Sequence, residues 1–209
     1  MEDKPKNVEE YIAKWQDAVN LNPGCGHSRF NLAVGLIGQR RFDEAIEQLQ
    51  EALECSPSLA EAYVQLGAIA LQRGDLDGCL EYNRMGVKSK AGFAVGWGNI
   101  GFCLLQKGEA FEAEQALRKA ISFNPNFVQA YTSLASAYFM QGLLDESIAA
   151  CEKALTLEPG FAVAHANLAL ALLQKGDVAR AAEHRDKARE LGYEVPEGLS
   201  AEIDAKLKS

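Results

Sequence analysis

The sequence predicts an all-α protein built from a repeated pair of helices. Residues 128–161 form two amphipathic halves, each with apolar residues at helical spacing, and Gly142 lies between them. Neither half could bury its apolar stripe alone, so the pair needs neighbours of the same kind. The rest of the chain supplies them. Prolines recur on one 34-residue grid and a small residue recurs upstream of each grid point: Pro23, Pro57, Pro125 and Pro159, with Ala18, Ala52, Gly86, Ala120, Ala154 and Ala188.

This grid divides the chain into terminal helices and five complete repeats. Residues 1–25 are expected to hold one helix, over 7–21, which matches the second half of a repeat and caps the open edge of the first full one. The five repeats are predicted at residues 26–59, 60–93, 94–127, 128–161 and 162–193. Residues 194–209 place Leu199, Ile203 and Leu207 on one stripe. A closing helix is expected there, because the terminal units of a helical array need a polar outer face.

The turns inside the repeats carry their own signals. Four first helices are followed by glycine at the same place, which is typical of a residue needed in the left-handed conformation after a helix. Aspartate follows two of these glycines and suits the first position of the second helix, where its carboxylate can accept backbone N–H groups. These residues are Gly74, Gly108, Gly142 and Gly176, with Asp75 and Asp177.

One joint departs from the pattern, between the second and third repeats. Asn83 replaces a bulky residue, Gly86 the alanine and Ala91 the proline, and Gly92, Gly96 and Gly98 follow closely. Two interpretations stay open: close packing of backbones, or a hinge.

The repeat resembles the tetratricopeptide repeat, which also has a period of 34 residues and is closed by proline. The resemblance rests on an aromatic, Leu-Gly and Tyr pattern that recurs in the first helices: Tyr63, Leu66, Gly67 and Ala70; Trp97, Ile100, Gly101 and Leu104; Tyr131, Leu134, Ala135 and Tyr138. It covers nearly the whole chain. It implies a right-handed superhelical solenoid of antiparallel helix pairs, in which the first helix of each pair lines the concave side.

The composition limits the classes of binding partner and the cellular compartment that we expect. The net charge is −8, which argues against binding nucleic acid or anionic lipid, since both need clustered Lys and Arg. The first residues lack the apolar core of a signal peptide, and no stretch is long enough to span a membrane. A cytoplasmic protein is therefore expected.

Catalytic and cofactor motifs are not found. His27, His165 and His184 have no nucleophile beside them in a recognisable motif, and the cysteines form no C-x-x-C pair of the kind that binds zinc. A phosphate-binding glycine loop would have to follow a strand, and no strand is predicted. The sequence therefore predicts neither an enzyme nor a metal or cofactor site.

The informative surface is the concave side that the resemblance implies. In this family four positions of each first helix contact ligands, which gives twenty positions here. About five would be charged if they followed the composition of the chain, yet none is. The residues predicted to bind a peptide are Phe30, Asn31, Val34, Val64, Gln65, Asn99, Phe102, Leu105, Ser133, Phe139, Asn167 and Leu170.

These positions form a polar column, Asn31, Gln65, Asn99, Ser133 and Asn167, beside an apolar one. Amides can pair with a bound peptide backbone, and the aromatic rings offer about 25 cal/mol per Å² of buried apolar area. The alternative is that both columns pack helix against helix and satisfy neighbouring backbone groups.

The predicted function is a non-catalytic scaffold, adaptor or assembly factor that binds an apolar or amphipathic segment of another protein. Relatives that grip chaperone C-termini carry Lys and Asn in the first repeat and Lys and Arg in the third. The matching places here hold Phe30, Val34, Val95 and Asn99, so such a carboxylate clamp is not expected. The basic residues Arg84, Lys88 and Lys90 are expected on a second helix, away from the groove. The alternative function is self-assembly into a homo-oligomer, either by end-to-end stacking or by insertion of a terminus into the groove of another copy. The candidate for insertion is the first helix, with Tyr11, Ile12 and Trp15.

Overall fold

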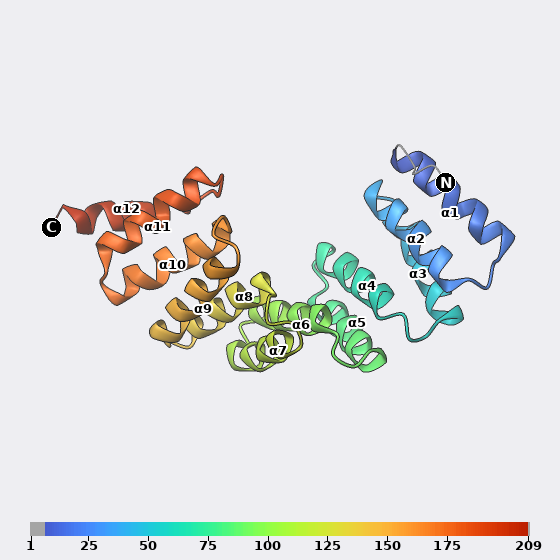
Figure 1. Cartoon of the computed structure of the whole chain (residues 1–209), viewed down its shortest axis with the longest axis horizontal. Helices are drawn as coiled ribbons and strands as arrows, with labels where there is room; N and C mark the ends of the chain where they lie inside the picture. Colours follow the sequence, from blue (N-terminus) through green and yellow to red (C-terminus); the bar gives the residue numbers. More distant parts are fainter. Residues whose placement is uncertain (1–6, 209) are drawn as a thin grey trace. The chain divides into compact units, whose positions relative to one another are not determined.

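The computed structural model of the chain describes residues 7–208, and within them helices are joined by short turns. Figure 1 labels these helices in chain order: α1 (Val8–Leu21), α2 (Gly26–Gly38), α3 (Phe42–Cys55), α4 (Ala60–Gln72), α5 (Leu76–Ser89), α6 (Ala94–Gln106), α7 (Ala110–Phe123), α8 (Val128–Met140), α9 (Leu144–Leu157), α10 (Ala162–Lys175), α11 (Val178–Glu190) and α12 (Glu197–Leu207). The predicted all-α architecture of repeated helix pairs is confirmed.

The helices gather into two compact units, and the boundary between Asn99 and Ile100 lies inside α6. In the first unit each helix from α1 to α5 packs against the next one along the chain. In the second unit the same holds from α7 to α12, and α8 also contacts α10. Each helix thus buries its apolar stripe against its neighbours, as a repeat array requires. None of the helices within residues 7–208 is long and apolar enough to cross a membrane.

The recurring small residues mark where the helices approach most closely. Ala52, Ala120, Ala154 and Ala188 are completely buried, because a second helix meets the helices beside it at these points. Gly86 takes the alanine's place in the second repeat, and a Cβ there would lie 3.4 Å from the carbonyl oxygen of Ala60.

Gly96, which follows α5, also lies in close contact with its surroundings. A Cβ on Gly96 would come within 2.7 Å of Cγ1 of Val87 and 3.0 Å of the ring of Phe93. A side chain would therefore force these neighbours apart. These contacts favour close packing as the reason for Gly86 and Gly96.

The turn between the two helices of each repeat has the same geometry five times. Gly74, Gly108, Gly142 and Gly176 have φ between 76° and 91°, so their predicted left-handed conformation is confirmed. In each turn one residue is in the left-handed conformation. The N–H of the next residue donates, at 2.9 Å, to a carbonyl oxygen near the end of the preceding helix. This bond satisfies a carbonyl that has no partner inside the helix.

The two predicted aspartate caps are also confirmed. The carboxylate of Asp75 accepts the N–H of Gly78 at 2.8 Å, and that of Asp177 accepts the N–H of Arg180 at 3.3 Å. Both bonds satisfy a donor in the first turn of a second helix.

The first repeat makes the same turn without glycine. Arg40 occupies the place of the four glycines, with φ of 60°, and is the one non-glycine residue with positive φ within residues 7–208. A side chain in this conformation costs about 1–2 kcal/mol, partly offset by the greater freedom of glycine in the unfolded chain. We expect Arg40→Gly to stabilise the chain by roughly 0.5–1 kcal/mol, measured by urea denaturation.

The matched control is Gly142→Ala. No atom lies within 4 Å of a Cβ added there, so backbone conformation alone should decide the outcome. This variant should be destabilised by about 1 kcal/mol. If Arg40→Gly instead destabilises the chain, the arginine side chain makes a contact that stabilises the fold by more than its left-handed backbone conformation costs.

Candidate functional site

Two adjoining clefts lie on the first helices of the second unit. One, of about 270 Å³, is lined by Phe102, Leu105 and Ser133 together with Asn167. The other, of about 160 Å³, is lined by Phe139 and Leu170 and also by Asn167. The two clefts share Ser136, Met140 and Asn167, so they form one continuous hollow, which we call the α8 groove. The structure therefore brings six of the predicted site residues together.

The α8 groove is uncharged and carries exposed apolar area. None of the residues that line its two clefts is charged. Phe102 is 41% exposed and Leu170 is 36% exposed. Apolar groups left in contact with water in this way favour the binding of another apolar surface.

The polar side of the groove is organised by hydrogen bonds between first helices. Nδ2 of Asn167, on α10, donates to the carbonyl oxygen of Thr132 at 3.3 Å and to the hydroxyl of Ser136 at 3.2 Å, both on α8. The amide of Asn167 therefore ties α10 to α8 within the chain. Its Oδ1 has no hydrogen bond among residues 7–208, so this oxygen can accept an N–H from a ligand.

Asn99 also forms a hydrogen bond inside the chain. Its Nδ2 donates at 3.1 Å to Oδ1 of Asn83, a fully buried residue whose own amide donates to the carbonyl oxygen of Cys79 at 2.8 Å. The amide N–H of Asn99 thus satisfies a buried acceptor of α5, which is the packing role that the sequence left open.

The remaining predicted residues lie in the first unit. Phe30 and Asn31 line a separate cleft of about 500 Å³, together with Leu59, Glu61 and Lys90. Val34, Val64 and Gln65 are half-buried along α2 and α4. This first-unit cleft is polar and contains an ion pair, so it differs in character from the α8 groove.

The position expected for Lys90 was wrong. Lys90 follows α5, and its Nζ reaches Oε1 of Glu61 on α4 at 2.6 Å, which brings it to the same cleft as Phe30 and Asn31. Helical periodicity placed it on the far side of a second helix. A flexible side chain at a helix end can instead turn toward a carboxylate on a neighbouring helix.

The α8 groove also has lining residues that the sequence analysis did not predict to bind a peptide. Met140 lines both clefts and is 50% exposed, while Gln106 and Val163 line one of them. A signal for Met140 was present: the corresponding places in the other repeats hold Gln72, Gln106, Gln174 and Gly38. An apolar residue where the other repeats carry glutamine or glycine is a candidate contact.

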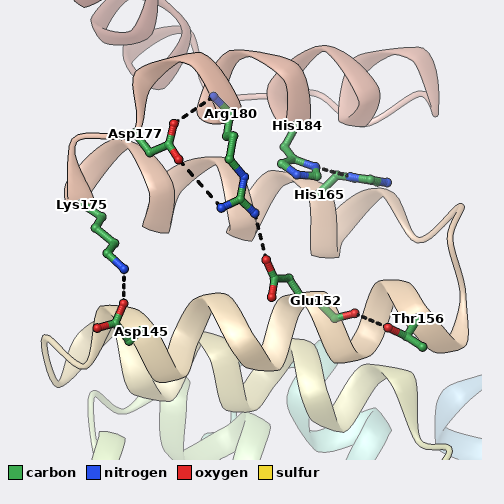
Figure 2. A network of polar contacts seen from close by, with 8 residues as sticks. All are labelled: Asp145, Glu152, Thr156, His165, Lys175, Asp177, Arg180 and His184. Carbon is green, nitrogen blue, oxygen red and sulfur yellow. Dashed lines mark hydrogen bonds and ion pairs between the residues drawn. The ribbon is translucent and has the colours of Figure 1, made fainter.

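Polar contacts fasten the last helices of the second unit (Figure 2). Arg180 of α11 pairs with Glu152 of α9 at 2.9 Å and with Asp177 at 3.8 Å. Lys175 of α10 pairs with Asp145 of α9. These side chains are between 41% and 76% exposed, so each pair contributes at most about 1 kcal/mol. Their arrangement nevertheless ties three consecutive helices together.

Two histidines face each other between α10 and α11 in Figure 2. Their Nδ1 atoms are 2.9 Å apart and the rings are stacked, while Nε2 of His165 lies 3.0 Å from the carbonyl oxygen of Pro159. A carbonyl only accepts, so Nε2 of His165 carries a proton. With both rings uncharged, Nδ1 of His184 therefore donates to Nδ1 of His165. Burial, and then the repulsion that a protonated His165 would exert, lower the pKa of His184. Within residues 7–208 no three potential metal ligands gather into one site.

Comparison with known proteins identifies the repeats. Family models described as tetratricopeptide repeat match residues 94–127 and 128–161, and one described as TPR repeat matches residues 39–74. No curated protein matches the chain in sequence. Many solved structures do match.

Three of these solved structures illustrate how similar they are to this chain in sequence and fold. MamA is 25% identical, with a TM-score of 0.67, over 85% of this chain and 98% of MamA. YrrB, described as a TPR protein with an unusual peptide-binding site, is 20% identical, with a TM-score of 0.72, over 93% of this chain and 99% of YrrB. PilF of Pseudomonas aeruginosa is 19% identical, with a TM-score of 0.76, over 94% of this chain and 86% of PilF.

The fold and the groove thus define an all-α helical repeat protein of the kind that binds other proteins. The chain belongs to the tetratricopeptide repeat family. Proteins of this family are generally non-catalytic, and this chain is a protein–protein interaction scaffold.

Proposed function

We propose that the chain is a non-catalytic adaptor or assembly factor, and that it binds an apolar or amphipathic segment of another protein in the α8 groove. The carrying observation is that this hollow is lined without a single charge while Phe102, Met140 and Leu170 stay exposed in it. Oδ1 of Asn167 offers an acceptor to the ligand backbone. We place the function in the cytoplasm, as the sequence predicts.

Binding to another protein is favoured over self-assembly by the position of α1. Tyr11 and Ile12 lie so close to α2 that a Cβ on Gly35 would be 3.1 Å and 2.7 Å from them, and Trp15 is half-buried against the same core. The apolar face that would enter another copy is therefore covered by its own chain.

The test compares three immobilised baits in a lysate of the source organism: wild type, Phe102→Asp and Phe123→Asp. Phe123 is a matched control, because it is 51% exposed at the far end of α7 and lines neither cleft of the groove. We expect wild type and Phe123→Asp to retain one protein from the lysate, and Phe102→Asp to recover at least tenfold less of it. The reason is that a buried unpaired carboxylate costs several kcal/mol.

Thermal melting of the three baits should agree, because both phenylalanines are partly exposed. Recovery of the same proteins by wild type and Phe102→Asp would contradict the proposal and leave packing as the role of the groove.

A further inference from the structure

Three exposed apolar residues of the second unit stand where the other repeats are polar or small. Phe111 is 59% exposed in the first turn of α7, and its place holds Asp43, Asp77, Asp145 or Ala179 in the other repeats. Leu143, exposed before α9, stands where the others have Arg41, Asp75, Glu109 or Asp177. Met140 is the third, as described above. We call Phe111, Met140 and Leu143 the apolar edge.

In the third repeat the bulky residue at the start of the second helix comes one position later than in the other repeats, and this residue is Phe111. The preceding place holds Phe42, Leu76, Leu144 or Val178 in the other repeats but Ala110 here, so the bulky side chain comes one residue later. One residue turns a helix by about 100°. The ring of Phe42 packs against the core, whereas that of Phe111 lies in solvent. Packing inside the repeat therefore does not account for Phe111.

Hydrogen bonds bring the segments that carry these residues together. Nε2 of Gln141, between Met140 and Leu143, donates to Oε2 of Glu114 at 3.0 Å and lies 3.4 Å from the carbonyl oxygen of Ala110. The turn between α8 and α9 thus lies on the first turn of α7. Because Met140 also lines both clefts, the apolar edge is continuous with the α8 groove.

The charges around the apolar edge are acidic. Glu112 follows Phe111 and Glu146 lies in the first turn of α9, and neither has an ion-pair partner among residues 7–208. The nearby Glu109 and Asp145 already pair with Lys107 and Lys175. Unpaired negative charge beside apolar surface complements a segment with apolar residues on one side and Lys or Arg on the other. A second copy of this chain fits less well, because each copy carries a net charge of −8.

We propose that the apolar edge is a docking surface for a basic amphipathic helix of a partner protein, and that this helix continues from the segment held in the α8 groove. The inference rests on the proposed function, since both surfaces would serve one partner. Apolar residues three and four places apart on the helix would contact Met140, Leu143 and Phe111, and its basic residues would face Glu112 and Glu146.

The test uses a fluorescent synthetic helix of about five turns, with leucine on one face and lysine on the other. Its affinity is measured by anisotropy for wild type, Phe111→Asp and Phe123→Asp. The last two variants carry the same substitution on the same helix, and their positions are about 18 Å apart along it. We expect Phe111→Asp to weaken binding at least tenfold and Phe123→Asp less than threefold. A probe with glutamate in place of lysine should bind at least tenfold more weakly.

Several results would overturn the inference. These are no binding of the lysine probe by wild type, equal loss in both variants, equal binding of the two probes, or a dimer in light scattering that dissociates in Phe111→Asp. If Phe102→Asp loses the cellular partner while Phe111→Asp binds the lysine probe as tightly as wild type, the proposed function stands and only the apolar edge is ruled out.

Discussion

Replacing Gly101 with alanine is expected to destabilise the second unit by about 1–3 kcal/mol, because it overfills a packed core. A Cβ at Gly101 would lie 2.4 Å from Cγ of Leu117 and 2.7 Å from its Cδ2, and Leu117 is completely buried. Neither the leucine nor the backbone of α6 can move away without disturbing other contacts. Urea denaturation measures the loss, and Gly198→Ala, with no atom within 4 Å of the new Cβ, serves as the control.

The next repeats suggest how to compensate for the loss. The corresponding pair is Ala135 and Cys151 in the fourth repeat, where a larger first residue faces a smaller second one. Leu117→Cys alone should cost about 2–4 kcal/mol through the cavity it leaves. The double variant should lose less than the sum of the two single losses, by about 1 kcal/mol or more. A strictly additive result would show that the two side chains do not share the space.

Acid is expected to destabilise the second unit through the histidine pair. The pKa of His184 is lower in the folded chain than its ordinary value of 6.5, so the unfolded chain binds the proton more readily. The contribution of His184 to the free energy of unfolding is therefore fully present above about pH 6.5. It is lost as the pH falls below that value toward the pKa of His184 in the folded chain. One proton can be taken up on Nε2 of His184 with the 2.9 Å bond intact. A second proton, on Nδ1 of His165, would place two N–H groups against each other.

The surroundings of His184 determine how strongly it resists protonation. Arg180 and Lys187 on its own helix and His165 on α10 disfavour its charged form, whereas Glu183 favours it. Burial is the largest effect, and it also disfavours the charged form.

The histidine pair can be replaced by the pair that the fourth repeat uses at the same places, Tyr131 and Ala150. We expect the variant His165→Tyr, His184→Ala to lose less stability than wild type between about pH 7.5 and about pH 5, measured by urea denaturation at each pH. Comparing the two chains cancels the titration of the carboxylates that they share. Parallel stability curves would show that the histidine contact does not sense pH.

The sequence by itself determined the architecture of this protein. Amphipathic spacing specifies each helix, and the 34-residue recurrence of small and turn residues specifies how the helices pair. These signals are local, so they can be read without coordinates. Even Arg40 adopts the left-handed turn, because its neighbours impose the same hydrogen bond that the glycines make in the other repeats.

The candidate site was predictable only as a set of positions on the first helices. Six of those positions meet in the α8 groove, but Asn99 forms its bond with buried Asn83, and Lys90 turns toward Glu61. Met140 completes both clefts from a place that the repeat pattern assigns to glutamine. Only the tertiary structure decided these outcomes. The partner of a side chain depends on which atoms of neighbouring helices lie within about 3 Å of it, and helical periodicity fixes a direction but not a neighbour.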